Sequence, residues 1–235
     1  MTTKKIALGT GGNKGVGFEI CKQLAQKDML VILTARAISR GQAAVQKLRA
    51  EGIGVLFHQL DVTDIESIDT ALNFIKKEFG RLDILVNNAG IFIDQQFTGL
   101  TVDPEMVITT YRTNVIGPLM LCQKCIPLMR ENDYGRIVNI SSELGLLHGM
   151  NTGQFPAYRM SKTGINALTR IMASLVKDDN IIINSMSPGW VKTDMGGQDA
   201  PGTADEGAKT AVWLATLDND GPRGRFFSDF AERDW

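Results

Sequence analysis

The sequence is poor in three features that would direct its function elsewhere: charge of one sign, long apolar runs and cysteine. Its 25 Lys and Arg residues nearly balance 26 Asp and Glu residues, so no net charge attracts nucleic acid or an anionic membrane. No apolar run is long enough for a signal peptide or a membrane span, so we expect a soluble, cytoplasmic protein. These absences favour chemistry on small molecules.

The three cysteines, Cys21, Cys122 and Cys125, are an odd number, which argues against a disulfide framework. Cys122 and Cys125 have C-x-x-C spacing, but they lie inside an expected helix without a second ligand pair, so we interpret them as helix packing. His58 falls in an expected strand and is interpreted as structural, whereas His148 could line a substrate entrance. No cluster has metal-ligand spacing, so we expect no metal.

Apolar runs bounded by turn residues alternate with amphipathic segments along the whole chain, which is the pattern of βαβ units around a parallel sheet. The predicted strands are 5–8, 30–34, 55–60, 84–87, 136–141, 181–186 and 224–227, and the predicted helices are 15–27, 39–50, 64–78, 104–130, 157–177 and 204–216. Thr203 and Glu206 have capping-box spacing at the start of the last helix. We expect one α/β domain over residues 1–235.

One segment interrupts this alternation. Residues 195–203, MGGQDAPGT, are rich in Gly and Pro and follow the end of a predicted strand, so they are predicted to form a mobile loop. We take about 190–204 as a candidate substrate loop, which could close over a bound molecule. An ordinary surface connection is the alternative, and the sequence leaves both open.

The first predicted strand leads into the glycine-rich stretch LGTGGNKGVGFEI at residues 8–20. A strand that ends in such a turn before a helix is typical of dinucleotide binding, because the helix N-terminus offers free amides and a partial positive charge. The spacing G-x-G-x-x-G fails when it starts at Gly9, because Lys14 holds the third position. Starting from Gly11, the stretch becomes T-G-x-x-x-G-x-G with Gly15 and Gly17.

This pattern resembles the nucleotide-binding signature of the short-chain dehydrogenase/reductase family, in the form found in its single-domain oxidoreductases. Further motifs similar to those of the family follow in order: Asp61-Val62, Asn87-Asn88-Ala89-Gly90, Asn114, Ser141-Ser142, Tyr158-x-x-x-Lys162, and Pro188-Gly189 with Thr193. The resemblance spans almost the whole chain. It implies a Rossmann fold with a doubly wound, seven-stranded parallel sheet in the order 3-2-1-4-5-6-7 and helices on both faces.

Within that family, NKGVGFEI, LTAR and the tail GPRGRFFSDFAERDW resemble the NADPH-dependent carbonyl reductases and their plant ketone-reducing relatives. Gly9 stands where the family usually has a branched aliphatic residue, so we expect a looser and slightly less stable end of the first strand. The stretch between Ser142 and Tyr158 is short, whereas monomeric carbonyl reductases carry a long helical insertion there. Because that insertion covers a subunit-packing face, its absence predicts a homodimer or homotetramer through helices 104–130 and 157–177.

The residues after the second predicted strand indicate which dinucleotide binds. An NAD enzyme places a carboxylate there to hold the ribose hydroxyls, but this chain has Ala35 followed by Arg36. A guanidinium can hold a 2′-phosphate, and Lys14 can add a second positive charge, so we predict NADP(H). The predicted cofactor-binding residues are Gly11, Asn13, Lys14, Gly15, Val16, Gly17, Arg36, Asp61, Val62, Asn88, Ala89, Gly90, Tyr158, Lys162, Pro188, Gly189, Val191 and Thr193.

Tyr158 and Lys162 lie four residues apart at the start of a predicted helix, so both project from one face. A nearby ammonium is expected to lower the pKa of the Tyr158 phenol from its ordinary value of about 10, making Tyr158 a general acid for reduction. The resemblance implies that Ser142 binds the substrate oxygen and that Asn114 anchors a water chain feeding protons through Lys162. Lys162 is also expected to hold the nicotinamide ribose.

The predicted function is the NADPH-dependent reduction of aldehydes or ketones to alcohols by hydride transfer. The predicted substrate pocket is apolar, favours a small hydrophobic carbonyl compound, and consists of Phe92, Leu144, Leu147, Phe155, Trp190 and Met195. Reduction of a 3-oxoacyl thioester, or of a C=C or C=N bond, is an alternative on the same scaffold. A non-enzymatic NADP(H) sensor is a further alternative, although a sensor needs no proton relay.

Overall fold

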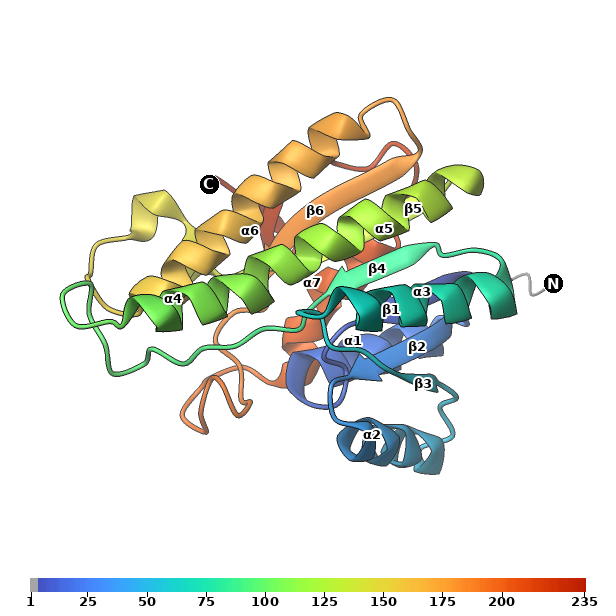
Figure 1. Cartoon of the computed structure of the whole chain (residues 1–235), viewed down its shortest axis with the longest axis horizontal. Coiled ribbons are helices and arrows are strands. Elements are labelled where there is room, and N and C mark those ends of the chain that lie inside the picture. The colour runs from blue at the N-terminus through green and yellow to red at the C-terminus, as the bar shows by residue number, and fades with distance from the viewer. Residues whose placement is uncertain (1–3) are drawn as a thin grey trace.

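Eight strands form one sheet in the computed structural model, which describes residues 4–235 (Figure 1). They are β1 (Ile6–Gly9), β2 (Leu30–Ala35), β3 (Leu56–Gln59), β4 (Ile84–Asn87), β5 (Gly135–Ile140), β6 (Ile181–Ser187), β7 (Phe226–Ser228) and β8 (Ala231–Arg233). Their order is β3-β2-β1-β4-β5-β6-β7-β8, and the first seven are parallel, as predicted. Residues 1–3 of the predicted domain lie outside the described residues.

The eighth strand is a difference from the predicted seven. β8 pairs with β7 in antiparallel fashion through a two-residue turn at Asp229 and Phe230, both of which have positive φ. Its sequence, Ala-Glu-Arg, is exposed and lacks an apolar face, so no hydrophobic pattern marks it as a strand.

Within the described residues, seven α-helices connect and follow the strands: α1 (Gly15–Gln26), α2 (Ile38–Ala50), α3 (Ile65–Phe79), α4 (Pro104–Tyr111), α5 (Gly117–Glu131), α6 (Pro156–Leu175) and α7 (Ala204–Ala215). The predicted helix 104–130 is divided into α4 and α5 by a π-helical turn at Arg112–Ile116. Two short 3-10 turns, Glu143–Gly145 and Leu147–Gly149, lie between β5 and α6. No helix within residues 4–235 combines the length and apolar character that a membrane crossing requires.

Two apolar layers hold the helices against the sheet (Figure 1). One layer packs α3, α5 and α6 on one face, with Ile68, Leu121 and Ile165 among its buried members. The other packs α1, α2 and α7 on the opposite face and includes Leu24 and Leu48. Burial on both faces explains why the inner strands read as continuous apolar runs.

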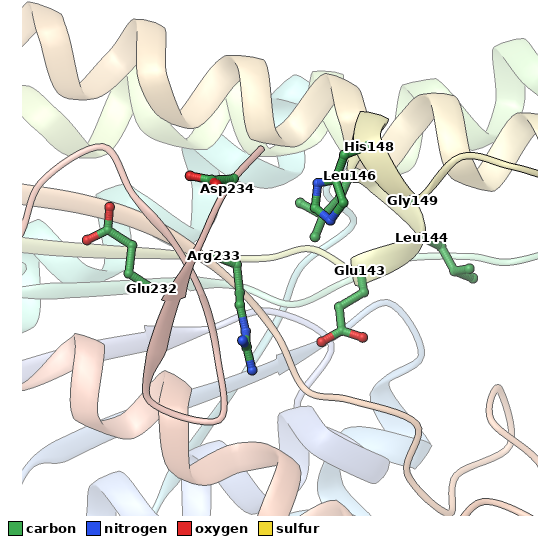
Figure 2. Close-up of a pocket in the computed structure, with 8 residues that line it drawn as sticks. All are labelled: Glu143, Leu144, Leu146, His148, Gly149, Glu232, Arg233 and Asp234. Carbon is green, nitrogen blue, oxygen red and sulfur yellow. The ribbon is translucent and has the colours of Figure 1, made fainter.

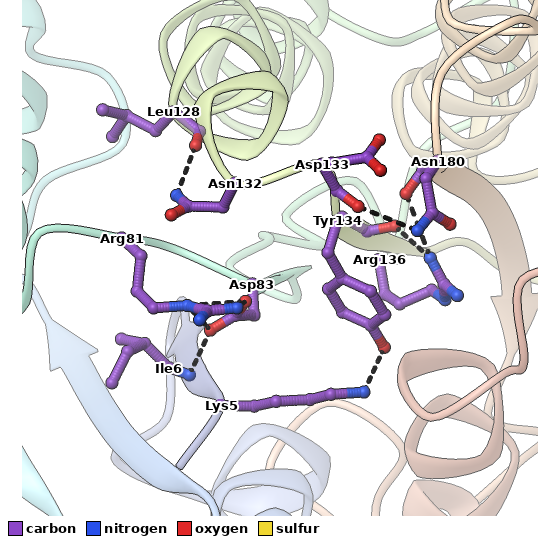
Figure 3. Close-up of polar contacts among 11 residues, drawn as sticks. Lys5, Ile6, Arg81, Asp83, Leu128, Asn132, Asp133, Tyr134, Arg136 and Asn180 are labelled. Carbon is purple, nitrogen blue, oxygen red and sulfur yellow. Dashed lines mark hydrogen bonds and ion pairs between the residues drawn. The ribbon is translucent and has the colours of Figure 1, made fainter. Parts of the chain in front are cut away.

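The amino ends of β1, β4 and β5 are joined by polar contacts (Figure 3). Asp83 is fully buried, accepts the backbone N–H of Ile6 at 2.7 Å and is paired with Arg81. Arg136 is also fully buried, and its guanidinium lies 4.2 Å from the centre of the Tyr134 ring. The contacts of these charged side chains lie at one end of the sheet and stabilise the strands there. The predicted site residues lie at the opposite, carboxyl end, where ligands of such sheets bind.

Candidate functional site

The glycine-rich turn after β1 is tied to the segment after β4 by two side chains. The Thr10 hydroxyl accepts the backbone N–H groups of Asn88 and Ala89, each at 2.9 Å. The Asn88 amide donates to the carbonyls of Thr10 at 2.9 Å and Gly11 at 3.1 Å. Asn88 was predicted to contact the cofactor, but in this structure its side chain shapes the turn. Thr10, which was absent from the predicted site, shares that role.

The three glycines of the T-G-x-x-x-G-x-G pattern are required for different reasons. Gly11 and Gly15 have φ of 62° and 56°, a backbone conformation that side chains disfavour. A Cβ on Gly17 would lie 2.2 Å from Asn88 Nδ2 and 2.5 Å from the Gly11 carbonyl oxygen, so only glycine fits there. Lys14, at the N-cap of α1, makes no side-chain capping bond, which leaves the first helical amides for a ligand. The turn therefore fits a dinucleotide pyrophosphate.

Gly9, which the sequence leaves unexplained, faces the thiol of Cys21. A Cβ on Gly9 would lie 2.7 Å from Cys21 Sγ, too close for any side chain. Gly9 is fully within β1 and pairs with both neighbouring strands. Burial raises the pKa of the Cys21 thiol to about 12, so this cysteine is a packing residue. Cys21 fills the space that a side chain at position 9 would take, and the expected loosening of the strand end stays a prediction.

The residues predicted for the adenosine end follow β2 and β3. Ala35 ends β2, and the next residue, Arg36, is exposed. The backbone carbonyl of Arg36 accepts a hydrogen bond from the Gln59 side-chain amide at 3.0 Å. The Asp61 carboxylate accepts the backbone N–H of Thr63 at 2.9 Å and the Thr63 hydroxyl at 2.7 Å. These two hydrogen bonds close the turn from Asp61 to Thr63.

The segment after β6 folds over the glycine turn. A Cβ on Gly15 would lie 3.1 Å from the Thr193 methyl group, and the Lys14 ammonium is 2.6 Å from the Asp194 carboxylate. The Trp190 indole donates to the Gly196 carbonyl at 2.7 Å, so the segment also holds its own shape. Its mobility stays a prediction. Four predicted residues, Pro188, Gly189, Trp190 and Val191, line a cavity of about 370 Å³ beneath it.

The other predicted residues come from β5 and α6. Tyr158 and Lys162 lie in the first turns of α6, and Ser142 follows β5. The hydroxyl of Ser142 hydrogen-bonds to that of Tyr158. The Lys162 ammonium lies 5.3 Å from the centre of the Tyr158 ring and donates to the Ile140 carbonyl at 2.8 Å. The structure therefore brings these three predicted residues together.

The electrostatics of this cluster differ from the prediction. Burial raises the pKa of the Tyr158 phenol to about 12, the Ser142 hydroxyl opposes this rise, and the Asp94 carboxylate adds to it. Burial also lowers the pKa of the Lys162 ammonium to about 8. The pKa of Tyr158 therefore moves in the direction opposite to the predicted one, and the largest cause is the burial of the phenol.

Asn114 occupies the π-helical turn between α4 and α5. Its side-chain oxygen accepts the Ile91 backbone N–H at 2.9 Å, and its nitrogen donates to the Ile91 carbonyl at 2.9 Å and to Ser161 Oγ at 3.0 Å. Both ends of the amide are therefore taken by the protein. The predicted water chain at Asn114 remains a prediction.

Two of the predicted substrate residues form an aromatic group with Tyr158. The Phe92 ring stacks on the Tyr158 ring with centroids 4.3 Å apart, and Phe155 meets Phe92 edge-on at 5.2 Å. Trp190 and Leu147 are instead 60% and 65% exposed, and neither contributes to this group.

A cavity of about 840 Å³ lies between the turns that follow Ser142 and the C-terminal tail (Figure 2). Of the predicted substrate residues, only Leu144 lines it. The remaining lining is Glu143, Leu146, His148, Gly149, Glu232, Arg233 and Asp234. This cavity is thus more polar than the predicted pocket. Besides Leu144, only His148, interpreted in the sequence as a residue that could line a substrate entrance, signals this cavity. The tail joins it through the β7–β8 hairpin, which no sequence pattern marks.

Comparisons with known proteins agree with the resemblance found in the sequence. Residues 5–203 match the family model described as short chain dehydrogenase. Carbonyl reductase (NADPH) 1 of Homo sapiens is 37% identical over 276 aligned positions, which cover 98% of each chain. Because 276 exceeds the 235 residues present here, that relative has segments that this chain lacks.

Two solved structures are similar over nearly their full length. The NADPH-bound carbonyl reductase from chicken fatty liver superposes with a TM-score of 0.88 at 29% identity, over 100% of both chains. Salutaridine reductase from Papaver somniferum superposes with a TM-score of 0.83 at 32% identity, over 95% of this chain and 99% of that one. The similarity therefore extends through the whole sheet and both helical layers.

Proposed function

Because this chain belongs to the short-chain dehydrogenase family, we propose that it is an oxidoreductase that reduces aldehydes or ketones to alcohols with NADPH. The observation that carries the proposal is the hydrogen bond between Tyr158 and Ser142, with Lys162 one helical turn away. These groups follow β5 and begin α6, at the same end of the sheet as the glycine turn. A proton donor and a dinucleotide cradle are the two parts that carbonyl reduction requires.

The cofactor assignment rests on the chain's own residues and on its relatives. Gly11, Gly15 and Gly17 leave the first amides of α1 open to the pyrophosphate. Arg36, exposed and directly after Ala35, takes the place of the carboxylate that would favour NAD. The human and chicken relatives carry NADPH in their descriptions. We assign Arg36 and Lys14 to the 2′-phosphate, where Lys14 would exchange its present partner, Asp194.

When bound, the cofactor supplies the hydride that the carbonyl carbon receives. Tyr158 donates its proton to the carbonyl oxygen, and Ser142 hydrogen-bonds to the same oxygen as negative charge develops there. With its pKa raised to about 12, Tyr158 stays protonated at neutral pH. Its proton still moves downhill to the oxygen, because an alkoxide is a much stronger base than a phenolate. Lys162, fixed by the Ile140 carbonyl, holds the nicotinamide ribose.

We propose a small hydrophobic carbonyl substrate. The aromatic group of Phe92 and Phe155 beside the Tyr158 ring offers an apolar wall close to the proton donor. Trp190 and Met195, on the segment after β6, expose apolar side chains that a closing loop could bring against the substrate.

A screen of NADPH oxidation tests this function. We expect turnover with an aromatic ketone or an aliphatic aldehyde, and a preference for a 3-oxoacyl thioester or an enone would select the alternative reactions. Tyr158→Phe should reduce kcat by about a hundredfold or more while NADPH still binds, because the general acid is lost. Tyr134→Phe, at the opposite end of the sheet, is the matched control. Tight NADPH binding with no turnover of any carbonyl compound would instead favour the sensor.

We also propose a homodimer or homotetramer through α4, α5 and α6. Ile108, Met160, Ile171 and Leu175 on these helices are between 45% and 65% exposed, which is high for large apolar side chains on neighbouring helices. The helices α4 and α6 pack side by side (Figure 1). Met160, Ile171 and Leu175 recur at intervals of 11 and 4 residues along α6, which places them on one helix face. Light scattering at micromolar concentration should give at least twice the mass of 25.7 kDa, and a monomer would contradict the proposal.

A cytoplasmic location completes the proposal. Cys21, Cys122 and Cys125 are free and buried, as suits a reducing compartment. Fractionation of cells that express the protein should recover it with the cytosolic markers.

A further inference from the structure

The helix that carries Tyr158 cannot cap its own N-terminus. Its N-cap residue is Phe155, which has φ of 58° and no side-chain acceptor, and Pro156 follows at the first helical position. The first amides of α6 are satisfied by a residue from another segment. Asp94 Oδ2 accepts the N–H of Ala157 at 2.7 Å and that of Tyr158 at 3.2 Å. The carboxylate therefore bonds directly to the backbone of the proposed proton donor.

Asp94 is fully buried, which is costly for a carboxylate. Its Oδ1 has no hydrogen-bond partner, so the two helical N–H groups are the contacts that compensate its charge. A helix N-terminus favours a negative charge, and Asp94 caps this helix from a segment that is distant in the sequence. An uncharged Asn or Ser would also cap the helix, so capping alone does not require a buried charge.

The segment around Asp94 is fixed on both sides. Asn114 holds both backbone polar groups of Ile91, and Phe155 donates its backbone N–H to the Phe97 carbonyl at 3.2 Å. Between these anchors, Phe92 stacks on the Tyr158 ring. We name residues 91–97 the clamp segment. It touches Tyr158 twice, at the ring through Phe92 and at the backbone through Asp94.

We propose that Asp94 is a positioning residue for Tyr158: its buried carboxylate holds the first turn of α6, and with it the phenol, in place for reduction. Its negative charge also opposes formation of the phenolate. This inference rests on the proposed function, because it assigns Asp94 to the reaction that Tyr158 performs. The clamp segment thus provides the aromatic support and the charge, and α6 provides the acid. This role agrees with the pKa of the Tyr158 phenol, which the Asp94 carboxylate raises.

Three charged groups belong to this environment. Lys162 faces the Tyr158 ring from the next turn of α6, and Arg159, buried on the same helix, donates from Nη2 to Thr152 Oγ1 at 3.1 Å. Asp94 faces it from the clamp segment, and the uncharged Ser142 bonds from the segment after β5. Removing the Asp94 charge takes a negative charge away from the phenol, so the phenolate of Tyr158 becomes easier to form.

Asp94→Asn tests the proposal, because it keeps an acceptor oxygen and removes the charge. We expect the alkaline limb of kcat/KM for carbonyl reduction to move to lower pH by about one unit, since a neighbouring charge shifts a pKa by about that amount. KM for NADPH should stay within about twofold. Asp94→Ala, which also removes the cap, should lower kcat by about tenfold or more through misplacement of Tyr158. Asp103→Asn, which alters an equivalent but exposed cap on α4, is the matched control and should behave as the wild type.

A second readout needs no turnover and separates failure of this inference from failure of the proposed function. The chain has three tyrosines, so the phenolate absorbance after a rapid alkaline jump, compared with Tyr158→Phe, isolates the Tyr158 ionisation. We expect this ionisation at lower pH in Asp94→Asn than in the wild type. If Asp94→Asn folds poorly, Asp94→Ser, which retains a capping oxygen, takes its place. A Tyr158 ionisation at the wild-type pH in the folded variant would overturn the proposal.

Discussion

Replacing Lys162 with methionine should stabilise the folded chain at neutral pH while it removes activity. Lys162 is buried on α6, with its ammonium held by one carbonyl, that of Ile140, at 2.8 Å. Burial lowers its pKa from 10.5 to about 8. Lys162 is still charged at pH 7, so its buried charge destabilises the folded state at that pH. Methionine has a similar length and no charge.

The size of the effect follows from the pKa. A fall from 10.5 to about 8 corresponds to about 3 kcal/mol, because each pKa unit is about 1.4 kcal/mol. The lost hydrogen bond to Ile140 offsets about 1 to 1.5 kcal/mol. The free energy of unfolding at pH 7 should therefore rise by about 2 kcal/mol, which for a domain of this size raises Tm by about 4–8 °C.

The pH dependence distinguishes this cause from better packing. Between pH 8 and 10.5 unfolded Lys162 keeps its proton and folded Lys162 loses it, so wild-type stability rises with pH relative to the variant. The advantage of Lys162→Met should be complete below pH 8, vanish at about pH 9.5 and become a deficit of about 1 kcal/mol by about pH 10.5. Urea unfolding at pH 7 and pH 10 measures it, with Lys177→Met, an exposed lysine just after α6, as the control. Equal stability of variant and wild type at pH 7, or a gain that does not change with pH, would refute the reasoning.

Three further predictions concern the cofactor cradle and the fold. Arg36→Asp should reverse the preference for NADPH over NADH in kcat/KM, because a carboxylate repels the 2′-phosphate; an unchanged ratio would contradict the assignment. Gly17→Ala should lower the free energy of unfolding by about 2 kcal/mol or more in urea titrations, because its Cβ would overlap Asn88; wild-type stability would show that the turn adjusts freely. Thr203→Ala should cost about 1 kcal/mol of stability with unchanged kcat, because it breaks the capping box with Glu206 that begins α7.

Much of the fold follows from local sequence patterns. The apolar runs and the amphipathic segments predict all seven parallel strands and five of the seven described α-helices within a few residues, because hydrophobic periodicity is a local property. The break between α4 and α5 escapes prediction, since a π-helical turn at Asn114 leaves the apolar period almost unchanged. β8 escapes as well, because its three exposed residues carry no pattern.

Much of the candidate site is also predictable, but its energetics are not. The spacing of four positions between Tyr158 and Lys162 predicts a shared helix face, and the structure brings Ser142 to it. The pKa of Tyr158 was expected to fall, yet it rises, because the degree of burial depends on what packs over the ring. Phe92 supplies part of that cover from a segment 66 positions earlier in the sequence.

The sequence by itself determined the sheet order through its family resemblance, the glycine turn and the shared helix face of Tyr158 and Lys162. These depend on short-range spacing and on backbone conformations that only certain residues adopt. Tertiary structure alone decided that Cys21 explains Gly9, that the C-terminal tail borders the turns after Ser142, and that Asp94 caps the helix of Tyr158. Asp94 lies 63 residues from the amide it binds, and only the packing of the clamp segment on α6 makes that contact. Such contacts depend on side-chain direction and burial, which no local pattern encodes.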